Sequence, residues 1–315
     1  MKIVVAGALG HIGSRLIRAL PLTFPGVDIT MIDDLSTQRF PALFDLPSEG
    51  HYRFIEGDII ELDLPGIIAG ADVVLQFAAL TDATRSFDRR EEMERNNFNT
   101  TRLMAEACAD SGVALLHPSS TSVYGTQNDV VDEDCSPEEL APQSPYAATK
   151  LREEELLSEL GRSHGLKFVT CRFGTIFGTS PGMRFHTAVN KFCWQAVMGQ
   201  KLTVWSTAYD QKRPYLDLDD CVRAVSHILH KNLFDRRIYN VLTINATVRE
   251  VVDSIRQIIP DLEVEFVDSQ IMNQLSYEVS NVRFQATGLS PQGDLTKGVG
   301  ETIRLLSAAN NRAGE

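Results

Sequence analysis

The sequence lacks the features that mark membrane proteins and nucleic-acid-binding proteins. No run of about 18 apolar residues occurs, so we expect no membrane span. The first apolar stretch, residues 3–6, is too short for the core of a secretory signal, which favours a cytoplasmic protein. Positive charge is also scarce, because 30 Lys and Arg residues face 42 Asp and Glu residues, for a net charge of −12. This balance excludes a chain built to hold nucleic acid phosphates.

Cysteine is sparse and widely spaced. The five cysteines stand at positions 108, 135, 171, 193 and 221, and none forms a C-x-x-C pair. This spacing gives no support for a zinc site, so we predict no metal. An odd, scattered set fits a reducing compartment better than a disulfide framework. Repeats and low-complexity linkers are absent as well, so the 315 residues are available for a large folded core.

The first half of the chain alternates between strand and helix patterns. Residues 2–6 read as a buried strand, 11–20 as a helix ended by Pro21, and 27–32 as a second strand. Further strands are expected at 52–56, 72–77, 113–117 and 166–171, with helices at 91–110 and from Pro145 onward. This alternation predicts an α/β fold, a Rossmann-type doubly wound parallel sheet with helices on both faces.

The pattern changes after about residue 175. Helices are expected at 185–199 and 248–258, short strands at 202–204 and 263–267, and residues 211–220 lead into another helix. We therefore predict a Rossmann domain over residues 1–175, with return segments around 215–242. A smaller, mixed α/β substrate-binding domain over 176–315 is expected to interleave with it.

A glycine-rich turn joins the first strand to the first helix. Gly7, Gly10 and Gly13 let the backbone turn sharply and approach a pyrophosphate at the helix N-terminus. Asp33 ends the second strand, 20 residues after Gly13, where an acid binds the ribose hydroxyls of a dinucleotide. A carboxylate there repels a 2′-phosphate, so the cofactor predicted is NAD rather than NADP. The competing interpretation of the glycines is a plain tight turn.

A tyrosine and a lysine stand four residues apart behind this turn. Tyr146 and Lys150 share one face of a helix, and an ammonium beside a phenol favours the phenolate. Ser120, in a hydroxyl-rich strand end, is placed to hydrogen-bond the substrate oxygen. The pair alone is more typical of a surface helix, but with the glycine turn and Ser120 it predicts a tyrosine acid/base. Strand ends also carry Gly7, Asp33, Asp58, Ala78, Ser120 and Arg172, so these residues are expected to share one crevice.

Taken together, these segments resemble the extended short-chain dehydrogenase/reductase superfamily, and within it the nucleotide-sugar epimerase/dehydratase group that contains UDP-galactose 4-epimerase. The resemblance covers nearly the whole chain. It implies Ser120, Tyr146 and Lys150 as catalytic residues. It implies a cofactor site of Gly7, Gly10, His11, Ile12, Gly13, Asp33, Asp34, Ser36, Asp58, Ile59, Phe77, Ala78, Ala79, Asn97, Tyr146 and Lys150.

The resemblance also implies an activity. Tyr146 would take a proton from a sugar hydroxyl, and NAD would take and return a hydride at C4 through a 4-keto sugar, so that a UDP-sugar is epimerised. The implied substrate contacts are Ser120, Thr121, Ser122, Thr175, Arg184 and Arg213. Homodimers are common in the group, and the helices at 91–110 and 146–161 are the expected interface.

Several positions depart from the group's pattern. Dehydratases usually carry Asp-Glu after the catalytic hydroxyl, and here Thr121-Ser122 offers no acid, which disfavours dehydration. Thr175 replaces a common asparagine, Asp217 a common histidine, and residues 204–210 lack a glycine-rich turn, so the sugar and its nucleotide stay open. The alternative activity is a nucleotide-sugar oxidoreductase, such as a 4-ketoreductase, decarboxylase or dehydratase. A redox-sensing protein without enzyme activity is a further alternative, which the Tyr146–Lys150 pair disfavours.

Overall fold

The computed structural model describes residues 1–81, 90–125, 130–268 and 276–308. A parallel sheet of seven strands forms its centre, in the order β11-β7-β5-β4-β1-β2-β3. The strands are β1 (Lys2–Ala6), β2 (Asp28–Asp33), β3 (His51–Glu56), β4 (Val73–Gln76), β5 (Ala114–Ser120), β7 (Phe168–Phe173) and β11 (Ile238–Val241). The predicted doubly wound Rossmann fold is confirmed.

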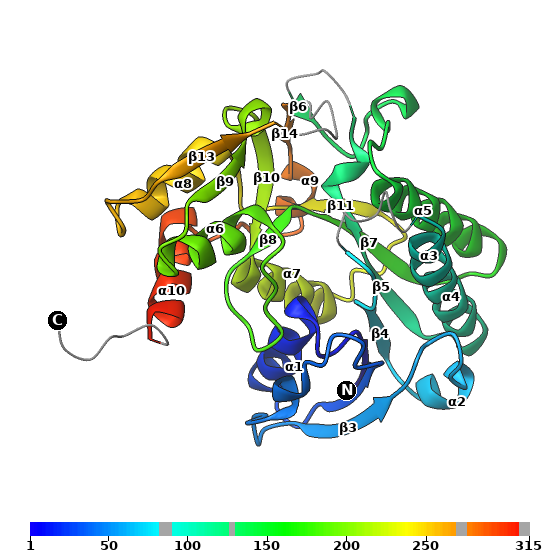
Figure 1. Cartoon of the computed structure of the whole chain (residues 1–315). Coiled ribbons are helices and arrows are strands. Elements are labelled where there is room, and N and C mark those ends of the chain that lie inside the picture. The colour runs from blue at the N-terminus through cyan, green and yellow to red at the C-terminus, as the bar shows by residue number, and fades with distance from the viewer. Residues whose placement is uncertain (82–89, 126–129, 269–275, 309–315) are drawn as a thin grey trace.

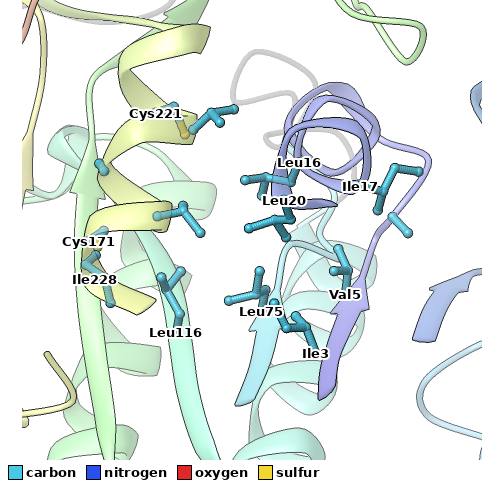
Figure 2. Close-up of a cluster of buried hydrophobic side chains, with 14 of the residues drawn as sticks. Ile3, Val5, Leu16, Ile17, Leu20, Leu75, Leu116, Cys171, Cys221 and Ile228 are labelled. Carbon is cyan, nitrogen blue, oxygen red and sulfur yellow. The ribbon is translucent and has the colours of Figure 1, made fainter. Parts of the chain in front are cut away.

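One face of this sheet is covered by α1 (His11–Thr23) and α7 (Leu218–Lys231), which lie side by side although they are far apart in sequence (Figure 1). Figure 2 shows how their apolar side chains meet those of the strands. Leu16 and Leu20 of α1 and Ile228 of α7 are fully buried against Ile3 and Leu116 in one cluster. Apolar burial of this kind is the main stabilising term in a fold.

The other face is covered by α2 (Leu64–Ile68), α4 (Asn99–Ser111) and α5 (Pro145–Ser163), as Figure 1 shows. Leu157 and Leu160 of α5 pack with Met104 of α4 against the strands, so these two leucines belong to the core. The predicted long helix at 91–110 is interrupted. It consists of α3 (Arg90–Met93), a π-helical turn (Glu94–Phe98) and α4.

The second half of the chain builds a separate apolar cluster from α6 (Ala188–Val197), α8 (Val248–Arg256) and α10 (Leu295–Ser307). Three small sheets accompany these helices. They pair β8 (Thr175–Phe177), β10 (Lys212–Asp217) and β12 (Ile244–Thr247); β9 (Leu202–Trp205) and β13 (Val264–Val267); and β6 (Val130–Val131) and β14 (Glu278–Val279). A short helix, α9 (Val282–Gln285), and 3-10 turns at Phe40–Leu43, Thr121–Val123, Pro137–Glu139 and Ser206–Ala208 complete the elements of the described residues.

The first helix does not end at Pro21, as the sequence predicts, but continues to Thr23. A proline removes one backbone donor, which normally leaves the carbonyl four residues earlier without a partner. Here that carbonyl belongs to Ile17 and lies 3.3 Å from the Tyr52 hydroxyl, whose one hydrogen it shares with the Pro47 oxygen at 3.0 Å. This tertiary contact partly replaces the missing helical bond, so the prediction was wrong for a reason that lies in β3.

The described residues contain no helix that is both long and apolar enough to cross a membrane.

Candidate functional site

Two adjoining cavities open at the carboxyl ends of the strands, near the switch in strand order between β1 and β4. The larger has a volume of about 460 Å³ and the smaller about 150 Å³. Gly7, Gly10, Phe77 and Ala79 line both, so the glycine turn is shared between them. Crevices at such a switch point are where doubly wound sheets bind ligands.

The glycine turn has no room for a Cβ atom at Gly7 or Gly13. Gly7 has a φ of +72°, and a Cβ there would lie 2.6 Å from the backbone nitrogen of Ala78. A Cβ on Gly13 would collide with the carbonyl oxygen of Gly7. Gly10 caps α1 without a side-chain hydrogen bond. His11, Ile12 and Gly13, in the first turn of α1, line the larger cavity, and the N–H groups of such a helix end suit a phosphate.

The smaller cavity is lined by the predicted acid-bearing residues. Asp33 accepts backbone hydrogen bonds from Leu9 at 3.0 Å and Leu35 at 3.1 Å, which fix its carboxylate at the end of β2. Burial raises the pKa of Asp33. The other predicted residues that line this cavity are Asp34, Ser36, Asp58, Ile59, Ala78 and Asn97. Their chemistry fits an adenosine, because carboxylates accept bonds from ribose hydroxyls.

Asn97 reaches the cavity through the π-helical turn. Its side chain accepts a hydrogen bond from the Leu80 nitrogen and donates one to the Leu80 oxygen, both at 2.8 Å. It therefore anchors the segment after β4, while also lining the smaller cavity. Short π-helical turns of this kind are frequent at functional sites.

The predicted catalytic residues line the larger cavity together. Ser120 ends β5, and Tyr146 and Lys150 lie on α5, whose first turn is capped by Ser144. The Ser120 hydroxyl lies 2.8 Å from that of Ser122, which also lines the cavity. Lys150 is 4% exposed and donates to Glu153 at 2.8 Å. The arrangement provides a phenol, a hydroxyl and a buried cation around one space.

The six predicted substrate residues do not all reach this space. Thr175 and Arg184 line the larger cavity with Ser120 and Ser122. Thr121 does not, because its hydroxyl is buried and donates to the Phe173 oxygen at 3.2 Å. Arg213 lines neither cavity and stacks over the Tyr277 ring at 5.3 Å.

Arg172 does not share the crevice, contrary to the sequence-based expectation. It is 2% exposed and pairs with the buried carboxylate of Glu154 at 2.6 Å. The side chain of Arg172 on β7 points inward because the Glu154 carboxylate of α5 and the Tyr124 hydroxyl accept hydrogen bonds from it there. The strand pattern placed the residue correctly but not the direction of its side chain.

The structure also brings in residues that sequence reasoning missed. Arg39 lines both cavities, although it stands six residues beyond Asp33, because Leu35 and Gln38 adopt left-handed conformations that fold the loop back. His186 joins Arg184 in the larger cavity. His11, a predicted cofactor residue, touches Ser180 at 2.9 Å, and burial followed by the charge of Arg184 lowers its pKa to about 3. The only sequence signal for Arg39 was its positive charge in an acidic chain.

The described residues contain no cluster of three or more His, Cys, Asp or Glu side chains that would hold a metal ion.

The chain is similar to known proteins over most of its length. The model of the NAD dependent epimerase/dehydratase family matches residues 3–241. An Arabidopsis thaliana trifunctional UDP-glucose 4,6-dehydratase/UDP-4-keto-6-deoxy-D-glucose 3,5-epimerase/UDP-4-keto-L-rhamnose-reductase is 29% identical over 96% of this chain. The match covers 46% of that relative, so the chain spans about half its length.

Two further proteins are similar over nearly their whole length. The uncharacterized UDP-glucose epimerase YtcB of Bacillus subtilis is 28% identical, with 98% of both chains covered. Among solved structures, the UDP-glucuronic acid 4-epimerase of Bacillus cereus, in complex with UDP-glucuronic acid and NAD, is 26% identical with a TM-score of 0.86. That match covers 98% of this chain and 100% of the other.

Proposed function

Because the chain belongs to the NAD dependent epimerase/dehydratase family, we propose that it is an NAD-dependent nucleotide-sugar epimerase. Its reaction inverts C4 of a UDP-sugar through a 4-keto sugar. The observation that carries this proposal is the meeting of Ser120, Tyr146 and Lys150 in the cavity that begins at the glycine turn. The similar proteins of Bacillus subtilis and Bacillus cereus, both named as epimerases, support it.

The residues around the two cavities fit NAD. Gly7, Gly10 and the first turn of α1 would hold its pyrophosphate, and Asp33 the adenosine ribose. The predicted residues Asp34, Ser36, Asp58, Ile59, Phe77, Ala78, Ala79 and Asn97 would complete this site, with His11, Ile12 and Gly13 at the helix end. When bound, NAD supplies a hydride acceptor that also returns the hydride.

The side chains that line the larger cavity have separate roles in the proposed reaction. Tyr146 takes the proton of the substrate hydroxyl and later returns it, as a positioned acid/base. Ser120 hydrogen-bonds the same oxygen, and Lys150 supplies a positive charge one helical turn from the phenol. Ser122, Thr175 and Arg184 line the rest of the cavity, and a guanidinium suits a diphosphate or another anionic group. Thr121 and Arg213 remain predicted contacts that the lining of this cavity does not include.

A nucleotide-sugar oxidoreductase, meaning a 4-ketoreductase, decarboxylase or dehydratase, is the second candidate. The similarity to the Arabidopsis protein, whose name includes a UDP-glucose 4,6-dehydratase, favours it. Dehydration needs an acid and a base next to the catalytic hydroxyl, and Thr121 and Ser122 supply neither. Thr121 also points away from the cavity toward Phe173. Epimerisation is therefore the better fit.

The two proposed ligands are assigned to different parts of the chain. We propose that residues 1–175, with return segments around 215–242, bind NAD, and that residues 176–315 hold the sugar nucleotide. We also propose a cytoplasmic homodimer that packs through the helices at 91–110 and 146–161. Light scattering on the purified protein tests the dimer, and a monomer at micromolar concentration contradicts it.

The function is tested by incubating the purified protein, without added cofactor, with UDP-glucose, UDP-N-acetylglucosamine and UDP-glucuronate. NMR of the products would show a C4-inverted sugar. Tyr146→Phe removes the acid/base with little change in shape, so we expect at least about a hundred-fold loss of kcat. Turnover that needs stoichiometric NAD(H), or that releases carbon dioxide, contradicts epimerisation and supports the oxidoreductase.

A further inference from the structure

Glu153 is a fully buried carboxylate beside the proposed catalytic pair. It lies on α5, three residues after Lys150, and its side chain has 0% exposure. Its Oε2 atom accepts a hydrogen bond from the Lys150 ammonium at 2.8 Å. Burying a carboxylate is costly unless a nearby charge compensates it. The Lys150 ammonium thus offsets the cost of burying the Glu153 carboxylate, and the carboxylate offsets the cost of burying the ammonium.

The same carboxylate oxygen faces a histidine on the neighbouring strand. Nε2 of His117 lies 3.1 Å from Oε2 of Glu153, and the ring has 0% exposure. Burial, followed by the charge of Lys150, lowers the pKa of His117, so the ring is neutral. His117 stands on β5, three residues before Ser120. Glu153 therefore lies between the strand that carries Ser120 and the helix that carries Tyr146 and Lys150.

The charges around Lys150 come from three elements. On α5, Glu153 and Glu154 both attract the ammonium, and Tyr146 lies one turn away. On β7, Arg172 pairs with Glu154 at 2.6 Å and offsets that carboxylate. On β5, His117 is neutral. Because Arg172 offsets the charge of Glu154, Glu153 is the carboxylate that mainly balances the charge of the Lys150 ammonium.

Water does not stabilise the Lys150 ammonium in place of Glu153, because the Lys150 side chain is only 4% exposed. Burial alone would lower the pKa of Lys150, but attraction to Glu153, and then to Tyr146, outweighs it, so this pKa is raised. An ammonium that lost its carboxylate in such a place would give up its proton more readily.

We propose that Glu153 is a positioning residue, whose carboxylate keeps Lys150 charged and holds its ammonium beside Tyr146. The consequence for the reaction rate rests on the proposed function, but the effect on Lys150 does not. Glu153 acts through Lys150 and does not line either cavity. The expected sign is simple: without the carboxylate, Lys150 loses its proton at a lower pH.

The test replaces the carboxylate with a neutral amide of the same shape, Glu153→Gln. Protein labelled with ¹³C at lysine is titrated by NMR, and the Lys150 signal is identified by its loss in Lys150→Met. We expect the Lys150 titration to fall by at least about one pH unit in Glu153→Gln. The high-pH limb of the kcat profile should move down with it, and kcat should fall roughly ten-fold while KM changes less.

Two variants separate this effect from a loss of packing. Leu157→Ala removes an equally buried but uncharged side chain from the same helix. His117→Gln replaces the neutral ring with a neutral amide. Both should destabilise the fold and leave the Lys150 titration in place. An unchanged titration in Glu153→Gln, or equal shifts in all three variants, overturns the proposal.

The native protein decides the matter if Glu153→Gln does not fold. The proposal requires native Lys150, although it is buried, to keep its proton as well as an ordinary lysine does, and a titration below the ordinary lysine range overturns it. The proposed function fails separately, by the absence of an epimerised product or by full activity in Tyr146→Phe. The NMR titration needs no substrate, so the two failures are distinguishable.

Discussion

At the scale of single residues, the glycine turn shows how a backbone position dictates its residue type. Gly7 and Gly26 both have left-handed φ angles, of +72° and +77°. They differ in their surroundings, because a Cβ on Gly7 would press against Phe77 and Ala78, whereas one on Gly26 would meet nothing within 4 Å. Substitutions at the two positions therefore separate the energetic cost of the left-handed φ angle from that of the steric contact.

We expect Gly26→Ala to lower the free energy of unfolding by about 1–2 kcal/mol, which is the cost of a left-handed angle for a residue with a Cβ. Gly7→Ala should cost at least about 3 kcal/mol, because the backbone after the end of β4 must also move, and it should abolish NAD binding. Urea denaturation and titration with NAD measure the two effects. Similar losses of stability in both variants would show that the contact is unimportant.

Two buried histidines predict how stability depends on pH. Burial lowers the pKa of both His11 and His117, the former to about 3. In the unfolded chain each ring takes up a proton near pH 6.5, so the unfolded state binds more protons below that pH. The contribution of each ring to stability is therefore complete above pH 6.5 and is lost as the pH falls below that value, down to about pH 3 for His11.

Each histidine should cost about 1.4 kcal/mol of stability for every pH unit below 6.5 over which its ring is protonated in the unfolded chain but not in the folded one. Urea denaturation between pH 7 and pH 4 measures the slope for the native chain and for His117→Gln. The variant should be less stable at pH 7 but should lose less stability on acidification. Parallel curves for the two proteins would mean that His117 is protonated in the folded state.

At the scale of elements, the sequence predicted the sheet well and the helix ends less well. Strand periodicity and the glycine turn depend on local residue order, so β1, β2 and α1 were expected within a few residues of where they lie. The passage of α1 through Pro21 depends on Tyr52, which lies in another strand. The π-helical turn that aims Asn97 at Leu80 depends equally on a distant contact.

The candidate site divides in the same way. Ser120, Tyr146, Lys150 and the glycines were predictable because motif spacing and strand ends set their positions. The inward turn of Arg172 was not, because it depends on Glu154 of another element. The approach of Arg39 depends on a loop conformation that residue types do not specify.

The start of α5 offers a test of how an element positions the site. The hydroxyl of Ser144, two residues before Tyr146, accepts a hydrogen bond from the Ala147 nitrogen at 3.2 Å. Ser144→Ala should lower the free energy of unfolding by about 1 kcal/mol and reduce kcat, because the turn that carries Tyr146 loses its cap. Ser144→Asp, which retains an acceptor, should preserve most of both. Equal loss in the two variants would contradict a capping role.

At the scale of the whole molecule, the chain leaves the large sheet after β7 and comes back to it through α7 and β11. β11 pairs with β7 at the edge of the sheet. Leu218, Val225 and Ile228 of α7 are buried in the same cluster as Ile3 and Leu16 from the start of the chain. Figure 2 shows Ile228, Ile3 and Leu16 of this cluster. Residues 1–175 alone therefore lack part of their own core.

This interleaving predicts that a fragment of residues 1–175 does not fold. Each large apolar side chain of α7 contributes about 1.5–3 kcal/mol when buried, so the loss of several such side chains is comparable with the stability of a typical domain, about 5–15 kcal/mol. The fragment should give a poorly dispersed amide NMR spectrum and aggregate, whereas the full chain should unfold in one cooperative transition. A fragment with a dispersed spectrum and a sharp urea transition would show that the glycine turn, its helix and the first strands form a core without α7. Addition of NAD separates the remaining case, because a fragment that folds only with the cofactor has a complete binding site on an incomplete core.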